Sequence, residues 1–201
     1  LQRAKRLRAF DPYVWFQCGM QEWLDEQYET ALSSFRHCLE LPNASPYFLP
    51  ILEQVATQRP AEEFLTRVVH HHPAFLFVGT LRIFSQPEQA EKRQPYLQRA
   101  LDLLRRKSDE DTTADDWRLQ ALILQELKQP AQAEECFLKA LFRAPRQHEW
   151  RLELARLYLE QEQFAKAQAA VETVVAHQPN HAQARDLLKQ LRELQRLRTR
   201  P

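Results

Sequence analysis

The sequence predicts an all-α fold in which antiparallel helix hairpins stack into a solenoid, and three observations support this prediction. The 201 residues include only two Gly, which disfavours β-hairpin turns and phosphate-binding loops because both depend on Gly. Twelve Pro among many helix-forming residues are typical of short helices separated by Pro. Similar residues also recur at a spacing of 34, in the pairs Ala121 and Ala155, Ala133 and Ala167, Phe137 and Val171, Ala140 and Val174, and Pro145 and Pro179.

The recurring residues indicate how each hairpin packs. Small residues at Gly19, Ala121 and Ala155 would let the first helix of a hairpin approach the second closely. The large side chains of Phe35 and Phe137 would fill the space between neighbouring hairpins. Pro would end the second helix, because it has no backbone N–H to donate. One hairpin cannot bury its apolar face alone, so several must stack.

The period of 34 divides the chain into segments. These are the end of an upstream repeat at 1–11, a repeat at 12–45, degenerate repeats at 46–73 and 74–107, an acidic linker at 108–113, repeats at 114–147 and 148–181, and a capping helix with a basic tail at 182–201. Pro95 predicts a kink or a late start in the second helix of 74–107. Thr113 or Asp115 is expected to cap the helix that carries Trp117. The incomplete first segment indicates a fragment of a larger protein.

The repeated pattern of Trp, a small residue, an aromatic, Ala-x-x-x-Phe and Pro resembles the tetratricopeptide repeat (TPR) family. It is carried by Trp15, Gly19, Ala31 and Phe35 in the first unit and by Trp117, Ala121, Ala133, Phe137 and Pro145 in a later one. The resemblance implies a right-handed TPR-like solenoid of about five repeats with a C-terminal capping helix. It also implies a concave groove, lined by the first helix of each repeat, that takes a peptide or protein partner.

The candidate binding residues are those that would face this groove. They are Tyr13, Phe16, Met20 and Trp23 in the first repeat and Arg118, Leu122, Gln125, Leu152 and Arg156 in the last two. The first four make their helix apolar nearly all round, and such a helix is either covered or binds a partner. Residues 1–10 or an upstream repeat are the alternative cover. The later set suits a peptide with apolar and acidic groups.

Some TPR proteins hold the C-terminal carboxylates of chaperones in a clamp of Lys and Asn. At the matching positions this chain has Phe16, Met20, Glu149 and Glu153. The sequence therefore does not favour a chaperone adaptor.

No catalytic, cofactor or metal site is predicted. Successive side chains of His70, His71 and His72 would point about 100° apart on a helix, and the acidic residues at 109–111 lack the spacing and Gly of a calcium loop. Nucleophile-elbow and zinc-protease motifs do not occur. Cys18, Cys38 and Cys136 form no C-x-x-C pair and are expected to be buried thiols. Unpaired thiols favour a reducing compartment, so we expect a cytoplasmic location.

The charge distribution argues against nucleic-acid binding. Residues 1–10 and 182–201 each carry a net charge of +4, which leaves −7 for the body of the chain because the total is +1. A repeat protein that follows a nucleic-acid backbone needs cationic repeats throughout. No apolar run approaches the ~18 residues of a membrane span, so direct insertion into a membrane is not expected.

The predicted function is a non-enzymatic protein–protein interaction scaffold. One alternative is the soluble TPR tail of a membrane-embedded enzyme, such as a bacterial glycan polymerase or ligase, since the basic opening residues suit a position close to a membrane. Another is self-association through the apolar helix of the first repeat.

Overall fold

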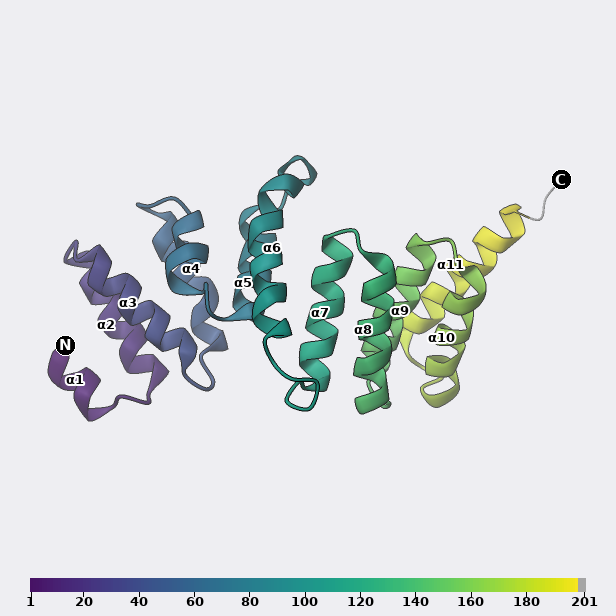
Figure 1. The fold of residues 1–201 in the computed structure, drawn as a ribbon, viewed down its shortest axis with the longest axis horizontal. Coiled ribbons are helices and arrows are strands. Elements are labelled where there is room, and N and C mark those ends of the chain that lie inside the picture. Colours follow the sequence, from purple (N-terminus) through teal and green to yellow (C-terminus); the bar gives the residue numbers. More distant parts are fainter. Residues whose placement is uncertain (199–201) are drawn as a thin grey trace. The chain divides into compact units, whose positions relative to one another are not determined.

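The computed structural model describes residues 1–198, and this part of the chain contains helices and no strand (Figure 1). The chain divides into two compact units after Arg106. The all-helical repeat architecture predicted from the period of 34 is confirmed. Residues 199–201, which the sequence assigns to the basic tail with Arg200, lie outside the described part.

Helices follow one another throughout both units. Unit 1 contains α1 (Gln2–Leu7), α2 (Pro12–Leu24), α3 (Tyr28–Glu40), η1 (Ser45–Tyr47), α4 (Phe48–Ala56), η2 (Phe64–Val68), α5 (Pro73–Ile83), η3 (Pro87–Gln89) and α6 (Ala90–Arg105). Unit 2 contains α7 (Ala114–Glu126), α8 (Pro130–Arg143), α9 (His148–Glu160), α10 (Phe164–His177) and α11 (Ala182–Arg198). The closest pairs are the hairpins α2–α3, α5–α6, α7–α8 and α9–α10.

The helix starts follow the period of 34 residues. In unit 2, α7, α9 and α11 begin at Ala114, His148 and Ala182, one period apart. Pro12, the first residue of α2, lies three periods before Ala114. The second helices α8 and α10 begin one period apart as well. The periodic residues of the sequence therefore hold equivalent places in successive hairpins.

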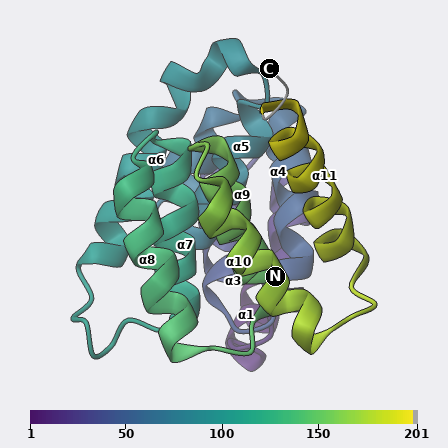
Figure 2. The same cartoon turned by 90° about the vertical axis from the view of Figure 1, so that its right-hand side faces the viewer.

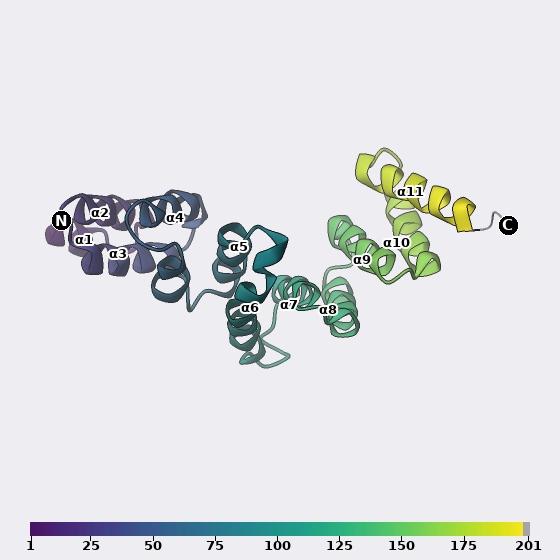
Figure 3. The same cartoon turned by 90° about the horizontal axis from the view of Figure 1, so that it is seen from above.

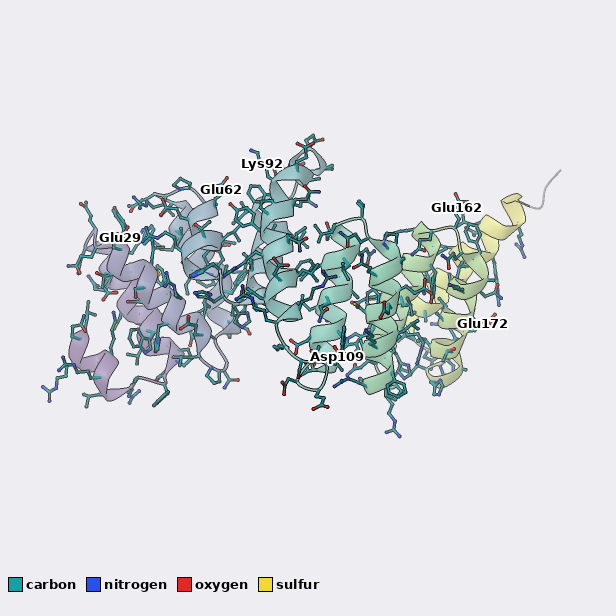
Figure 4. All side chains as sticks on the ribbon, viewed as in Figure 1. Glu29, Glu62, Lys92, Asp109, Glu162 and Glu172 are labelled. Atoms are coloured by element: carbon teal, nitrogen blue, oxygen red, sulfur yellow. The ribbon has the colours of Figure 1, made fainter. Side chains whose placement is uncertain are left out.

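The turn inside each clear hairpin has the same geometry. After α2, α7 and α9 the chain passes through a residue with positive φ: Glu26 (59°), Lys128 (59°) and Glu162 (56°). In the first turn, Glu26 N–H donates to Trp23 O at 3.1 Å and Gln27 N–H to Glu22 O at 2.8 Å. The other two turns repeat these bonds, and the pattern is the Schellman motif. Figure 4 labels Glu162 at the turn between α9 and α10.

The middle of unit 1 departs from regular hairpins. In the segment 46–73, where a repeat would have an ordinary second helix, Phe64–Val68 form a short π-helix, η2, with Leu65 and Val68 buried. Of the two alternatives predicted at Pro95, a kink or a late helix start, the late start is wrong, because α6 begins at Ala90 and continues through Pro95. Pro95 leaves only the carbonyl of the exposed Glu91 without its helical N–H donor, and water can replace that bond.

The linker of unit 2 ends in the expected helix cap. Thr113 Oγ1 accepts from Asp116 N–H at 3.1 Å, and Asp116 Oδ2 accepts from Thr113 N–H at 3.0 Å. This reciprocal pair is a capping box. Burial opposes ionisation of Asp116, but hydrogen bonds from Lys107 and Thr113 outweigh it and lower the pKa of the carboxyl below its usual value.

The cores consist of the residues that the period singled out. Ala31, Phe35, Ala121, Ala133, Phe137, Ala155, Ala167 and Val171 are all fully buried. A Cβ on Gly19 would lie 2.5 Å from the ring of Phe35, so the first hairpin packs too closely for a larger residue there. All three Cys are buried and none forms a disulfide, as predicted. Burial raises the pKa of the Cys38 thiol to about 12.

A buried ionic cluster fastens α1 to the first hairpin. Lys5 Nζ donates to Glu22 Oε1 and to Ser34 Oγ, both at 2.6 Å, and Ser34 Oγ donates to Glu22 Oε2 at 2.5 Å. Lys5 is 7% exposed and Glu22 2%. The basic residues that open the chain are therefore not all solvated, because the charge of Lys5 is neutralised inside unit 1.

Candidate protein-interaction surface

Three of the candidate residues lie together along α2. Asp11 caps this helix by accepting from Tyr13 N–H at 3.0 Å, and Pro12 at its first position fits the fixed φ of Pro. Tyr13 is 54% exposed, and Phe16 and Met20 are half-buried. We call Tyr13, Phe16 and Met20 the aromatic stripe. One side chain that the sequence did not single out, Tyr47 of η1, stacks on Phe16 with ring centroids 5.0 Å apart.

The first residues of the chain pack on the other side of α2. Lys5 Nζ lies 5.0 Å above the ring of Trp15, and Trp15 Nε1 donates to Ala9 O at 2.8 Å. These contacts cover Trp15 and leave Tyr13 open to solvent. Residues 1–10 are therefore not a complete cover for the aromatic stripe.

Trp23 was expected on the same stripe, and this prediction is wrong. It is 1% exposed, and its ring lies 4.9 Å from that of Tyr28 and 6.1 Å from that of Phe35. Tyr28 follows directly after the turn of the hairpin, so its ring folds back over the end of α2. Trp23 is therefore a core residue, while Leu24 beside it is 69% exposed.

In unit 2 the candidate polar residues bind the neighbouring repeat. Arg118 of α7 donates to both carboxylate oxygens of Glu153 of α9, at 2.8 and 2.6 Å. This bidentate bond raises the pKa of Arg118 above its usual value. Gln125 Nε2 donates to the carboxylate of Glu160 at 3.1 Å. An acidic ligand would therefore have to displace an intramolecular carboxylate before it could bind Arg118.

Two side-chain bonds join α9 to α11 and to His181, the residue before it. Arg156 Nη2 donates to Gln183 Oε1 at 3.0 Å, and His181 Nε2 lies 2.9 Å from Glu149 Oε1. Arg156 is exposed and its partner is uncharged, so its positive charge is not neutralised by that bond. Figure 2 shows α9 with α7 on one side and α11 on the other.

The position of α9 between two helices explains a second correction. Leu152 was expected in the groove but is fully buried. It lies on α9 next to Glu153, which bonds to α7, and one turn before Arg156, which bonds to α11. Leu122 of α7 is half-buried. The residues of the unit 2 set that reach solvent are thus Arg118, Leu122, Gln125 and Arg156.

A hollow that the sequence did not predict lies on α8. Leu138 is 50% exposed and Phe142 88%, and with Trp117 they line a cavity of about 460 Å³. Lys139 Nζ lies 4.5 Å from the centroid of the Trp117 ring. The spacing of Leu138 and Phe142 by four residues, outside the repeat pattern, is the signal that could have found it.

Two other kinds of site are absent from the part of the chain that the structure describes. Among residues 1–198, no three His, Cys, Asp or Glu side chains come close enough to hold a metal ion. In the same range no helix is both long and apolar enough to cross a membrane.

Comparison with known proteins supports the resemblance. A sequence model described as tetratricopeptide repeat matches residues 124–191, which run from the end of α7 through α8, α9 and α10 into α11. This part of the chain is similar to the tetratricopeptide repeat family. Among curated proteins, no sequence matches it.

Solved TPR structures share the fold. A thermophilic TPR protein of Thermus thermophilus, TTC0263, aligns with 90% of this chain and 98% of its own length at 21% identity, with a TM-score of 0.54. YrrB, described as a TPR protein with an unusual peptide-binding site, aligns with 94% of this chain and 97% of its own length at 16% identity, with a TM-score of 0.52.

A longer relative is found in the hetero-tetramer of Cut9 and Hcn1 from the APC/C. It matches 94% of this chain at 19% identity, with a TM-score of 0.53. This chain spans only 38% of that one. At these identities the structural matches establish the TPR fold.

Proposed function

We propose that this protein is a non-enzymatic scaffold that binds a peptide or protein partner through the first helices of its repeats. The observation that carries the proposal is the aromatic stripe: Tyr13 stays 54% exposed although α1 packs on the same helix. Phe16 and Met20 extend the stripe along α2 as half-buried side chains. Contiguous exposed apolar side chains on a soluble protein mark interaction sites.

The chemistry of the stripe indicates what it binds. Phe16 is held by its stacking on Tyr47, so a partner meets an ordered aromatic surface, and little rotamer entropy is lost on binding. Tyr13 adds a hydroxyl beside this surface. Aromatic residues that combine a large apolar face with a polar end are enriched at binding hot spots. The favoured ligand is an extended or helical segment with an apolar side chain that packs between Tyr13 and Met20.

Unit 2 contributes a more polar surface to the proposed scaffold. Because Arg118 is already bound to Glu153, its part in recognition is to order the surface rather than to supply a free charge. Arg156 and the half-buried Leu122 are the groups that remain for a partner. The similarity in fold to YrrB, a TPR protein with an unusual peptide-binding site, supports a peptide ligand for this chain as well.

The test compares two double variants in affinity capture from lysate of the source cells. Tyr13→Glu with Met20→Glu places two charges on the aromatic stripe, and Leu138→Glu with Phe142→Glu makes the same kind of change on α8. All four side chains are wholly or partly exposed, so circular dichroism should show unchanged helix content in both variants. We expect a partner bound by the wild type to be lost from the first variant and kept by the second. Equal loss from both, or loss from the second alone, would exclude the aromatic stripe.

The alternative of a TPR tail on a membrane-embedded enzyme stays a prediction, as does self-association through the first repeat. Sedimentation equilibrium of the wild type and of the Tyr13→Glu, Met20→Glu variant separates self-association from partner binding. A dimer that the variant abolishes would make a second copy the ligand of the stripe.

A further inference from the structure

A cationic groove lies between α10 and α11 of unit 2, whereas the aromatic stripe belongs to unit 1. It has a volume of about 500 Å³. It is lined by the apolar side chains of Val175 of α10 and Leu188 of α11 and by the cations Arg185, Lys189 and Arg192. Arg196 and one acidic residue, Glu193, complete the lining. We call it the α11 groove.

The repeat register explains where this groove comes from. α11 begins one period of 34 residues after α9, so Lys189 holds the place of Ala155, and Gly19 holds that place in α2. The Gly19 position directly faces the second helix of its hairpin, since a Cβ there would touch Phe35 of α3. The α11 groove is therefore the face on which the second helix of a hairpin packs in the preceding repeats.

On α11 this face has been changed from apolar to cationic. The α9 residues in the same register as Leu188, Lys189 and Arg192 are Leu154, Ala155 and Tyr158, and all three are buried. On α11 only the leucine is kept, while Lys189 and Arg192 are exposed. The opposite face of α11 stays apolar and packed, with Ala184, Leu187 and Leu191 buried. Figure 3 shows α11 against α10 in unit 2.

The charges of Arg185, Lys189 and Arg192 are not neutralised within the described chain. Among residues 1–198, neither Arg185, Lys189 nor Arg192 has a carboxylate within salt-bridge distance. The three occupy positions i, i+4 and i+7 of one helix, so they form a single stripe. A lysine at the place of Gly19 and Ala155 also prevents an ordinary apolar helix from approaching closely, because its ammonium would be buried without a partner.

We propose that the α11 groove binds an acidic amphipathic helix of a partner protein, which packs where the second helix of a hairpin lies in the other repeats. An apolar side chain of the partner would contact Leu188 and Val175, and carboxylates on either side of it would pair with Arg185, Lys189 and Arg192. The concave shape of the α11 groove fits a partner helix better than a membrane, since a bilayer surface is flat and does not enter a hollow between two helices. Charge complementarity of this kind determines the choice of partner and the association rate.

The probe is a fluorescent peptide based on the chain's own second helix. It has the sequence of Phe164–His177 with Ala167→Glu and Val174→Glu, while the buried Val171 is kept as the apolar anchor. The control peptide carries Lys at the same two positions. Fluorescence anisotropy with the full chain should give binding of the Glu peptide that is at least about tenfold tighter than that of the Lys peptide, and that weakens as salt rises.

Two charge-matched variants make the test specific. Arg185→Glu, Lys189→Glu and Arg192→Glu reverse the groove, and Arg3→Glu, Arg6→Glu and Arg8→Glu make the same net change on exposed residues of unit 1. We expect the groove variant to lose about tenfold in affinity for the Glu peptide, from three exposed charge pairs, and the unit 1 variant to lose less than about twofold. Circular dichroism would confirm that both variants remain folded.

The other outcomes overturn the proposal. An equal loss of affinity for the Glu peptide in both variants would mean that binding depends only on the net charge of the protein. Co-sedimentation with phosphatidylserine vesicles that depends on Arg185, Lys189 and Arg192, without peptide binding, would assign the groove to an anionic membrane. Dimerisation that the groove variant abolishes would assign it to a second copy of the chain.

Discussion

Replacing Gly19 by Ala tests whether the first hairpin packs as closely as the structure shows. The new methyl group would lie 2.5 and 2.6 Å from two ring carbons of Phe35. Phe35 is fully buried beside Trp23, so its ring can move only by displacing other core side chains. Overpacking of this kind costs ~1–3 kcal/mol, and Ala returns about 1 kcal/mol through its higher helix propensity. Because both contacts are much shorter than an ordinary Cβ contact, the overpacking cost is expected in the upper part of its range, about 2–3 kcal/mol, which leaves a net destabilisation of about 1–2 kcal/mol.

Urea denaturation followed by tryptophan fluorescence measures this change. Gly79→Ala is the matched control, since its nearest contact is the end of the Leu65 side chain at 2.9 Å, which can shift by rotation. It should cost less than the Gly19 change. Phe35→Leu should relieve the clash, so the double variant Gly19→Ala, Phe35→Leu should be more stable than the sum of the single changes predicts, by at least about 1 kcal/mol. A Gly19→Ala protein as stable as the wild type, or strict additivity, would refute the close packing.

Three more outcomes follow from the buried groups. Lys5→Met should destabilise the protein by about 3 kcal/mol because it leaves the Glu22 carboxylate buried without its partner, and adding Glu22→Leu should restore most of this loss; a neutral single variant in thermal unfolding would contradict it. Cys38, with its pKa raised to about 12, should not react with a thiol reagent at pH 8 until the protein unfolds, and rapid labelling of the native protein would contradict its burial. Burial and the bond to Glu134 raise the pKa of Tyr158 to about 12, whereas the pKa in the unfolded chain is about 10. Tyr158 therefore stabilises the fold below about pH 10, and this contribution is lost as the pH rises through about 12. Ultraviolet titration of the Glu134→Gln variant should show that Tyr158 ionises at a lower pH than in the wild type.

Much of the fold could be predicted because one spacing fixes the place of every helix in the clear repeats. The starts of α2, α7, α9 and α11 all obey it, and the cap at Thr113 follows from local chemistry alone. The π-helix η2 could not be predicted in this way. Its apolar residues have the spacing of an ordinary helix, and nothing in that spacing distinguishes one backbone hydrogen-bond pattern from another.

Burial within the candidate surface was harder to predict. Repeat position alone does not show whether a side chain has neighbours on both sides, and for this reason Trp23 and Leu152 were wrongly expected at the surface. Tyr28 covers Trp23. Leu152 is enclosed because α9 is bonded to both α7 and α11. The ionic cluster of Lys5 had a usable signal. Its partner Glu22 is a charged residue in the register where Leu124 and Tyr158 are buried, and a buried carboxylate requires a cation.

The Schellman turns have a consequence for how stable this protein can become. Left-handed backbone costs a side-chain-bearing residue about 1 kcal/mol more than Gly, yet Glu26, Lys128 and Glu162 occupy it in all three turns, and the only two Gly of the chain lie inside helices. Gly at each of these positions should therefore raise the free energy of unfolding by a small amount. This gain is partly offset because Gly increases the conformational entropy of the unfolded chain. The turns at Lys128 and Glu162 are linked by the bond from Gln125 to Glu160, so we expect the gains of these two substitutions to be coupled rather than strictly additive. The chain thus lies below the highest stability that its backbone allows, as is general for natural proteins, and three surface substitutions would raise its stability while both proposed binding surfaces stay unaltered.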